Sequence, residues 1–175
     1  VMASHSVEKI GGTSMAATST LFDNVLIGGR RGAELYQRIF VVSAYAGMTN
    51  LLLDHKKTGE PGVYALFVRS DPGWRDALDR VRDAMSKRNA AMFARGDSLT
   101  EANRFVRQRI DALRACLEDL DRLRAHGRFA LKDQLATVRE MLAGFGEAHS
   151  AHSTALLLRD RGVDALPLEP VGDED

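Results

Sequence analysis

Residues 39–42, Ile-Phe-Val-Val, form a continuous apolar run in which three of the four residues are β-branched. A fully buried strand of a parallel sheet has this pattern. A shorter strand is predicted over residues 7–10, which run into two glycines, and a helix over residues 13–26. That helix should stop at Gly28 and Gly29, since glycine tolerates the left-handed backbone of a helix end. A strand, a helix and a buried strand in this order open a βαβ unit, so we expect an α/β fold.

Residues 74–126 predict a helical hairpin. Apolar residues recur at spacings of four and three along two stretches: Trp74, Leu78, Val81 and Met85, then Val106, Ile110, Leu113, Leu117 and Leu120. Two such stripes suit antiparallel helices that pack along one seam. Residues 95–97 would form the turn, and Ser98 with Glu101 has the form of a capping box that begins the second helix. Trp74 would anchor the hairpin, and Cys116 would pack near its seam.

The remainder of the chain is expected to complete one domain. Glycines at 144 and 146 indicate that a new segment begins there, with a helix over about 147–161 that stops at Gly162. Residues 163–168 read as one more strand. We therefore expect a domain over residues 6–168, with the hairpin inside it, and an acidic tail over 169–175.

The charges are balanced, because Lys+Arg and Asp+Glu each number 24 and the formal net charge is zero. This balance gives no reason to expect nucleic acid or a membrane surface as a partner, and no apolar run approaches the roughly 18 residues of a membrane span. The single cysteine excludes an internal disulfide and fits a reducing compartment. Since the first residues do not look like a signal peptide, the expected location is the cytoplasm.

The first candidate site is the hexapeptide that begins at Lys9. It continues through Gly11 and Gly12 into Thr13 and Ser14. A strand that ends in two glycines and opens a helix presents backbone N–H groups and a partial positive charge to an anion, and a phosphate can approach glycine closely. Lys9 would add a full charge. The lysine precedes the glycines, so this is not a Walker A loop, and a Gly-Gly turn beside an exposed lysine would look the same.

The second candidate site follows the buried strand, at residues 43–50. Ligand sites in α/β sheets gather at the carboxyl ends of strands. Ser43, Thr49 and Asn50 carry small polar groups that suit carboxylate or phosphate oxygens. A plain loop with a threonine that caps the next helix is the alternative interpretation.

The third candidate site is Glu147, at the predicted helix start after the two glycines. A glutamate there usually stabilises the helix dipole. If the loop lines a cleft, Glu147 would instead bind a substrate ammonium group. His149 and His152 are three residues apart, but no third ligand has a compelling spacing, so no metal site is assigned.

These three motifs occur in the order found in the amino-acid kinase family, and they resemble aspartokinases most. Residues 7–14, Val-Glu-Lys-Ile-Gly-Gly-Thr-Ser, resemble the family's opening, with Ile10 where phenylalanine is usual. Residues 41–50, Val-Val-Ser-Ala-Tyr-Ala-Gly-Met-Thr-Asn, are similar to its second signature. Residues 145–150, Phe-Gly-Glu-Ala-His-Ser, resemble its third. Residues 55–67, together with the tyrosine of the second motif, resemble the aspartokinases associated with ectoine synthesis.

The resemblance implies a three-layer α/β sandwich of the amino-acid kinase type and a role for each motif residue. Lys9 would neutralise the transferring phosphoryl group, and Gly11, Gly12, Thr13 and Ser14 would cradle phosphate. Ser43 and Thr49 would bind L-aspartate, and Glu147 would hold its amino group. The reaction would be the ATP-dependent, Mg²⁺-assisted phosphorylation of the β-carboxylate, at the entry to lysine, threonine, methionine and ectoine synthesis. We also expect a homo-oligomer.

The family pattern continues with a glycine-rich Gly-Ser-Asp motif and a nucleotide-binding half, neither of which is found in the 175 residues. We therefore expect a truncated kinase domain that is inactive by itself. Two alternatives remain open at this point. One is a non-enzymatic helical assembly module whose dimer surface is the hairpin seam, and the other is a kinase for glutamate or acetylglutamate.

Overall fold

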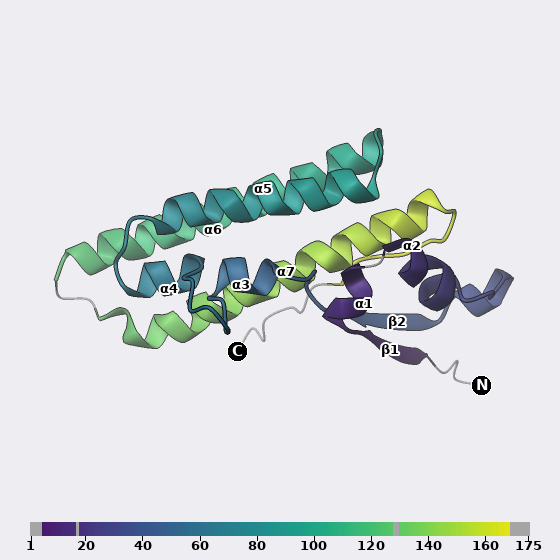
Figure 1. Ribbon diagram of the computed structural model, residues 1–175, viewed down its shortest axis with the longest axis horizontal. Helices are drawn as coiled ribbons and strands as arrows, with labels where there is room; N and C mark the ends of the chain where they lie inside the picture. The colour runs from purple at the N-terminus through teal and green to yellow at the C-terminus, as the bar shows by residue number, and fades with distance from the viewer. Residues whose placement is uncertain (1–4, 17, 128–129, 169–175) are drawn as a thin grey trace.

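The computed structural model describes residues 5–16, 18–127 and 130–168, and of residues 16, 18 and 19 only the backbone. The predicted tail at 169–175 lies outside the described residues. Long helices run side by side along the molecule, and a small sheet lies near one end of them (Figure 1). The part of the chain so described contains no helix that is both long and apolar enough to cross a membrane.

The sheet consists of two parallel strands, β1 (Ser6–Ile10) and β2 (Arg38–Val42), with Lys9 paired to Val41. This confirms the predicted strands and the α/β class. The full burial expected of residues 39–42 is wrong among the described residues, because Ile39 and Val41 on one face of β2 are exposed. The prediction of one helix over residues 13–26 is wrong. The connection consists of α1 (Gly12–Ala16), α2 (Thr18–Leu21), the π-helical η1 (Phe22–Ile27) and the 3₁₀-helical η2 (Gly32–Leu35). Ser and Thr recur over residues 13–20, and these residue types favour caps and turns over the interior of a helix.

Arg38 ties this broken connection to the sheet. Its guanidinium donates hydrogen bonds of 2.7 and 2.8 Å to the Glu8 carboxylate. It also donates to the backbone carbonyls of Val25, at 3.0 Å, and Leu26. The bond from Arg38 is the main reason that the pKa of Glu8 falls to about 2. Gly28, whose φ of 57° is left-handed, then ends η1 as predicted.

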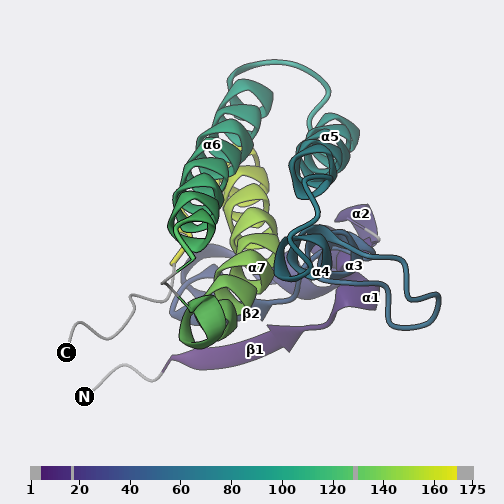
Figure 2. The ribbon, with the colours of Figure 1, turned by 90° about the vertical axis from the view of Figure 1, so that its left-hand side faces the viewer.

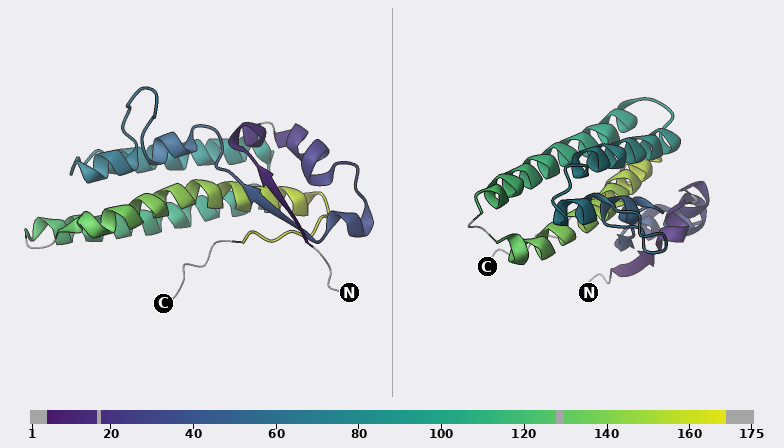
Figure 3. Two further views of the ribbon diagram at one scale, coloured as in Figure 1. Left: turned by 90° about the horizontal axis from the view of Figure 1, so that it is seen from below. Right: turned by 60° about the vertical axis from the view of Figure 1, so that its left-hand side comes forward.

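The helical hairpin is confirmed. Helix α5 (Trp74–Met92) packs against α6 (Asp97–Ala125), and both run alongside α7 (Gln134–Asp160) (Figure 1 and Figure 3). Trp74 is fully buried and donates a 3.1 Å hydrogen bond from its indole nitrogen to Asp121 on α6. The capping box is wrong, because α6 begins one residue earlier, after Gly96, without a side-chain cap. Ser98 instead donates a 2.5 Å bond to Asp160 at the end of α7.

The last segment differs from the prediction. A short 3₁₀ turn, η3 (Leu131–Asp133), leads into one continuous helix, α7 (Gln134–Asp160), which passes through Gly144 and Gly146 without a break. Glycine inside a helix costs only about 1 kcal/mol, and burial of almost the whole of residues 153–158 outweighs that cost. The strand expected over 163–168 is absent from this described stretch, where Pro167 cannot donate to a sheet.

The two faces of the sheet have different surroundings. Ile10, Phe40 and Val42 pack against the core formed with the helices, below which the sheet lies in Figure 2. Helices α3 (Met48–Leu52) and α4 (Val63–Val68) complete that core between the sheet and the hairpin. The opposite face carries Val7 and Ile39, which are exposed. A three-layer sandwich would cover this second face, so that part of the fold prediction is not confirmed among the described residues.

Candidate active site

The first two sequence motifs meet at the carboxyl ends of the parallel strands. The backbone N–H of Ser43, just after β2, donates a 3.1 Å hydrogen bond to the carbonyl of Ile10, at the end of β1. A Cβ atom at Gly12 would lie 3.3 Å from the carbonyl oxygen of Ala44. The glycine-rich segment and the loop after β2 are therefore in direct contact, as their positions in a βαβ unit predict.

Lys9 is exposed on β1, one residue before the end of that strand. Its partner in the register is Val41, so Lys9 lies on the sheet face that the helices leave uncovered. The described residues form no ion pair with it. Its ammonium group is thus available to a ligand at the strand ends.

Gly11 is a position at which the fold itself does not require glycine. Its φ is not positive, and a Cβ built there would meet nothing within 4 Å. Space beside the backbone at this point fits the close approach of a phosphate. Helix α1, which begins at Gly12, has only five residues, so its dipole contributes less than the predicted long helix would. Thr13 and Ser14 in its first turn are exposed.

The second motif combines a buried anchor with exposed polar groups. Tyr45 is buried, and its carbonyl accepts a 3.1 Å hydrogen bond from the N–H of Met48. Gly47 has a φ of 85°, which turns the chain into α3. Thr49 is exposed on the first turn of that helix, and Ser43 is half-buried. The buried side chain of Tyr45 therefore anchors the loop in the core, while Thr49 is exposed to solvent.

The third motif lies on α7 and contacts the loop after β2. Ser150 donates a 2.8 Å hydrogen bond from its hydroxyl to the carbonyl of Ser43. A Cβ at Gly146 would lie 3.0 Å from the Cβ of Ala44 and 3.3 Å from Leu52. The two contacts press α7 against the loop after β2, and Glu147 lies between them in the sequence.

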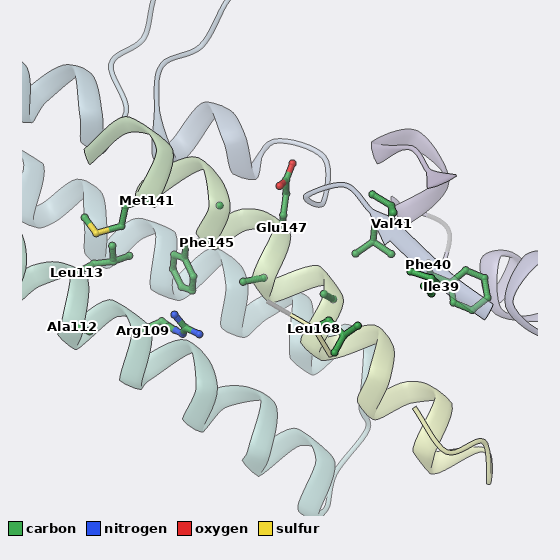
Figure 4. A pocket seen from close by; sticks show the side chains of 14 residues that line it. Ile39, Phe40, Val41, Arg109, Ala112, Leu113, Met141, Phe145, Glu147 and Leu168 are labelled. Carbon is green, nitrogen blue, oxygen red and sulfur yellow. The ribbon is translucent and has the colours of Figure 1, made fainter. Parts of the chain in front are cut away.

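Glu147 is exposed at the border of a cavity of about 650 Å³ between β2, α6 and α7. In Figure 4 it projects from α7 toward the side of the helix away from Arg109, with Val41 of the strand nearby. The other side chains around the cavity are almost all apolar: Ile39, Phe40, Val41, Val42, Ala112, Leu113, Met141, Phe145, Ala148, Ala151 and Leu168. A carboxylate at such a border can bind a cation while it remains solvated.

The two histidines of the third motif have different surroundings. His149 is buried, and its Nε2 lies 2.8 Å from the side-chain oxygen of Asn89. His152 instead stacks on Phe105, with 4.2 Å between the ring centroids. Burial is the main cause that lowers the pKa of His149 to about 3, and the charges of His152 and Arg88 add to it. His149 is therefore neutral at pH 7, and burial also raises the pKa of Tyr45 beside it.

Sequence reasoning missed the residues of α5 that approach these motifs, Arg88 and Asn89. A signal was present, because Asn89 follows Met85 by four residues, where the apolar seam predicts another apolar side chain. Asn89 is fully buried there. Ser150 belongs to the third motif, but its contact with Ser43 depends on the tertiary fold and has no local signal.

Comparison with known proteins gives one clear relationship. The chain is 55% identical over 163 residues to the aspartate kinase Ask_Ect of Stutzerimonas stutzeri strain A1501. The match covers 92% of this chain and 34% of the relative, so the chain spans about a third of that relative's length. No protein-family model and no solved structure matches the chain. The extent and level of this identity confirm the resemblance seen in the motifs: over 92% of its length, the chain is similar to part of an aspartate kinase.

Proposed function

We propose that this chain supplies the aspartate-binding and phosphoryl-neutralising part of an aspartate kinase. The reaction is the ATP-dependent phosphorylation of the β-carboxylate of L-aspartate to 4-phospho-L-aspartate. The observation that carries the proposal is the convergence of three distant motifs, through the contacts from Ser43 to Ile10 and from Ser150 to Ser43. The two-stranded sheet would then be part of a larger three-layer sandwich.

The proposed roles follow from charge and exposure. Lys9 neutralises the phosphoryl group in transfer, and the backbone around Gly11 approaches it closely. Ser43 and Thr49 bind the carboxylates of aspartate, and Glu147 binds its ammonium group. The nucleophile is a carboxylate that is already ionised at pH 7, so the site needs no strong base. The work of these residues is therefore to hold two anions together and to offset their repulsion.

The space at Gly11 fits a phosphate, because neither the backbone conformation nor a neighbouring side chain otherwise requires glycine there. Gly12, Thr13 and Ser14 would complete the cradle with backbone N–H groups that the first turn of a helix leaves without intrahelical partners. Mg²⁺, when bound with ATP, supplies further positive charge to the transferring group. The product would enter the synthesis of lysine, threonine, methionine or ectoine.

The proposal is tested in a completed kinase, in which this chain is joined to the part of the Stutzerimonas relative that it does not match. The purified protein is assayed with ATP and Mg²⁺ against L-aspartate, L-glutamate and acetylglutamate. Aspartate-dependent release of ADP and formation of an acyl phosphate support the proposal. Turnover with glutamate or acetylglutamate but not with aspartate would overturn the assignment of the substrate.

A further inference from the structure

Arg88, near the end of α5, contacts two of the three motif-bearing segments at once. Its guanidinium donates a 2.8 Å hydrogen bond to the backbone carbonyl of Met15, which follows the glycine-rich segment. The same group lies over the ring of Tyr45 in the loop after β2, 4.5 Å from the ring centroid. Arg88 itself belongs to the hairpin and is distant in sequence from both segments.

The residues beside Arg88 extend this contact to the third segment. The side-chain oxygen of Asn89 lies 2.8 Å from His149, which is two residues after Glu147, and its amide donates to Asn103 at 3.0 Å. The Tyr45 hydroxyl donates to the sulfur of Met92 at 3.2 Å. The end of α5 therefore touches the glycine-rich segment, the loop after β2 and α7.

We propose that Arg88 is a positioning residue of the kinase site, which holds the glycine-rich segment and the loop of residues 43–47 in a fixed relation. The inference rests on the proposed function, because it concerns the geometry between phosphate and aspartate. A guanidinium suits this position because it is planar, always charged, and able to stack on an aromatic ring while it donates in its own plane. A lysine ammonium can do only part of this.

The energetic argument concerns alignment. In-line phosphoryl transfer depends on the distance between the attacking carboxylate and the phosphorus atom, and a misplacement of about 1 Å can cost 10²-fold in rate. The Ser43 to Ile10 bond fixes the two segments at the base of the loop. Arg88 adds a second fixed point at the ring of Tyr45, which restricts rotation of the loop about the first.

The direct experiment measures local hydrogen exchange in the 175-residue chain for the parent, Arg88→Met and Arg88→Lys. The matched control is Arg82→Met, on the same helix, because the ion pairs that Arg82 makes among the described residues are to Asp79 and Asp83 of α5, at 2.8 and 2.9 Å. For Arg88→Met we expect exchange in residues 12–15 and 44–50 to accelerate roughly tenfold, as the loss of one hydrogen bond and one cation–π contact implies. The exchange rates of Arg88→Lys should lie between those of the parent and Arg88→Met, and the rates of Arg82→Met should match those of the parent.

The same variants are then assayed in the completed kinase. Arg88→Met should lower kcat roughly 10- to 100-fold and raise the KM of both ATP and aspartate, with partial recovery in Arg88→Lys. Unchanged exchange in both segments overturns the proposal. So does a uniform acceleration over the whole chain, since that is the mark of a merely structural residue. If the completed parent shows no aspartate phosphorylation, the proposed function fails, while the exchange data still decide whether Arg88 couples the two segments.

Discussion

The hydroxyl of Ser150 on α7 donates a 2.8 Å hydrogen bond to the backbone carbonyl of Ser43, a residue 107 positions away, just after β2. The same hydroxyl lies 2.9 Å from the carbonyl of Glu147, one turn earlier in its own helix. Ser150 thus connects the loop proposed to bind the aspartate carboxylates with the turn of helix that presents the proposed ammonium ligand. Together with the close packing of Gly146 against Ala44, this side chain helps to fix the spacing between Ser43 and Glu147.

Gly146→Ala should disturb this junction, and Gly144→Ala should not. A Cβ at 146 would lie 3.0 Å from the Cβ of Ala44, whereas a Cβ at 144 would meet nothing within 4 Å. Both changes gain about 1 kcal/mol of helix propensity, so Gly144→Ala should raise the free energy of unfolding by up to about that amount. In Gly146→Ala, the new methyl group should displace the loop at Ala44, and the cost should cancel the increase in the free energy of unfolding. In the completed kinase this variant should raise the KM for aspartate. Urea unfolding and steady-state kinetics compare the pair, and equal behaviour of the two variants would contradict the close packing at residue 146.

Lys9→Ala tests the proposed neutralisation of the phosphoryl group. Lys9 is exposed on its strand and forms no ion pair with the described residues, so its removal should leave the melting temperature unchanged. In the completed kinase, kcat should fall by roughly 10² or more, with a smaller change in the KM for aspartate. The matched control is Lys57→Ala, an exposed lysine in the loop before α4. A parental kcat in Lys9→Ala would refute the role.

Glu147→Gln tests the proposed contact with the substrate ammonium group. The change removes a charge and keeps the size of the side chain, so the KM for aspartate should rise about tenfold or more while the KM for ATP stays near the parental value. Glu140→Gln, exposed on the same helix, is the control. If only the KM for ATP moved, Glu147 would belong to the nucleotide side of the site.

His149 should make the stability of the fold depend on pH. Because burial lowers its pKa to about 3 from an ordinary 6.5, the unfolded chain binds a proton between these values that the folded chain does not. Stability due to this group is therefore complete above pH 6.5 and is lost as the pH falls toward 3, by up to about 1.4 kcal/mol per pH unit. His149→Gln can still donate to Asn89 but cannot titrate. Urea unfolding at pH 7, 5.5 and 4.5 should show a shallower decline for this variant, and parallel declines would contradict the buried neutral imidazole.

The elements that sequence alone predicted are those with a local signal. Residues 39–42 predicted a strand because four apolar side chains in succession suit few other structures, although Ile39 and Val41 are exposed rather than buried. The seam from Trp74 to Met85 repeats at helical spacing. The failures have tertiary causes. Glycines 144 and 146 suggested a boundary, but burial of the turns that follow keeps α7 continuous. Residues 163–168 have strand composition but lie beside no strand among the described residues.

The candidate site was predictable in its parts but not in its connections. Lys9, Ser43 and Glu147 were selected because each lies in a motif. That the end of β2 lies against α7 could not be read from the sequence, since a contact between residues 107 positions apart leaves no periodic signal. The role proposed for Arg88 also has no local signal in the sequence, because an arginine on a helix is usually a solvated surface residue.

A polypeptide of these 175 residues alone should show no aspartate kinase activity and should self-associate. Phosphoryl transfer requires both substrates in line within one site, and the roles proposed for the motifs account for the aspartate and the transferring phosphate but not for the rest of the nucleotide. The chain spans 34% of the length of its relative. The uncovered sheet face presents Val7, Ile39 and Val41 around Lys9, with exposed fractions of 67%, 41% and 49%, and exposed apolar side chains gathered on one face favour association. A coupled assay with ATP, Mg²⁺ and aspartate tests the first part.

Light scattering over a range of protein concentrations tests the second part. The double variant Ile39→Thr with Val41→Thr keeps β-branched side chains but removes apolar surface, so it should reduce the apparent mass at a given concentration. Leu123→Thr, at a 42% exposed position on α6, removes a comparable apolar group far from the sheet and should change nothing. A monomeric parent at all concentrations would contradict the idea that the sheet face drives association. Robust turnover by the purified chain would mean that the chain itself, or another copy of it, supplies the nucleotide side of the site.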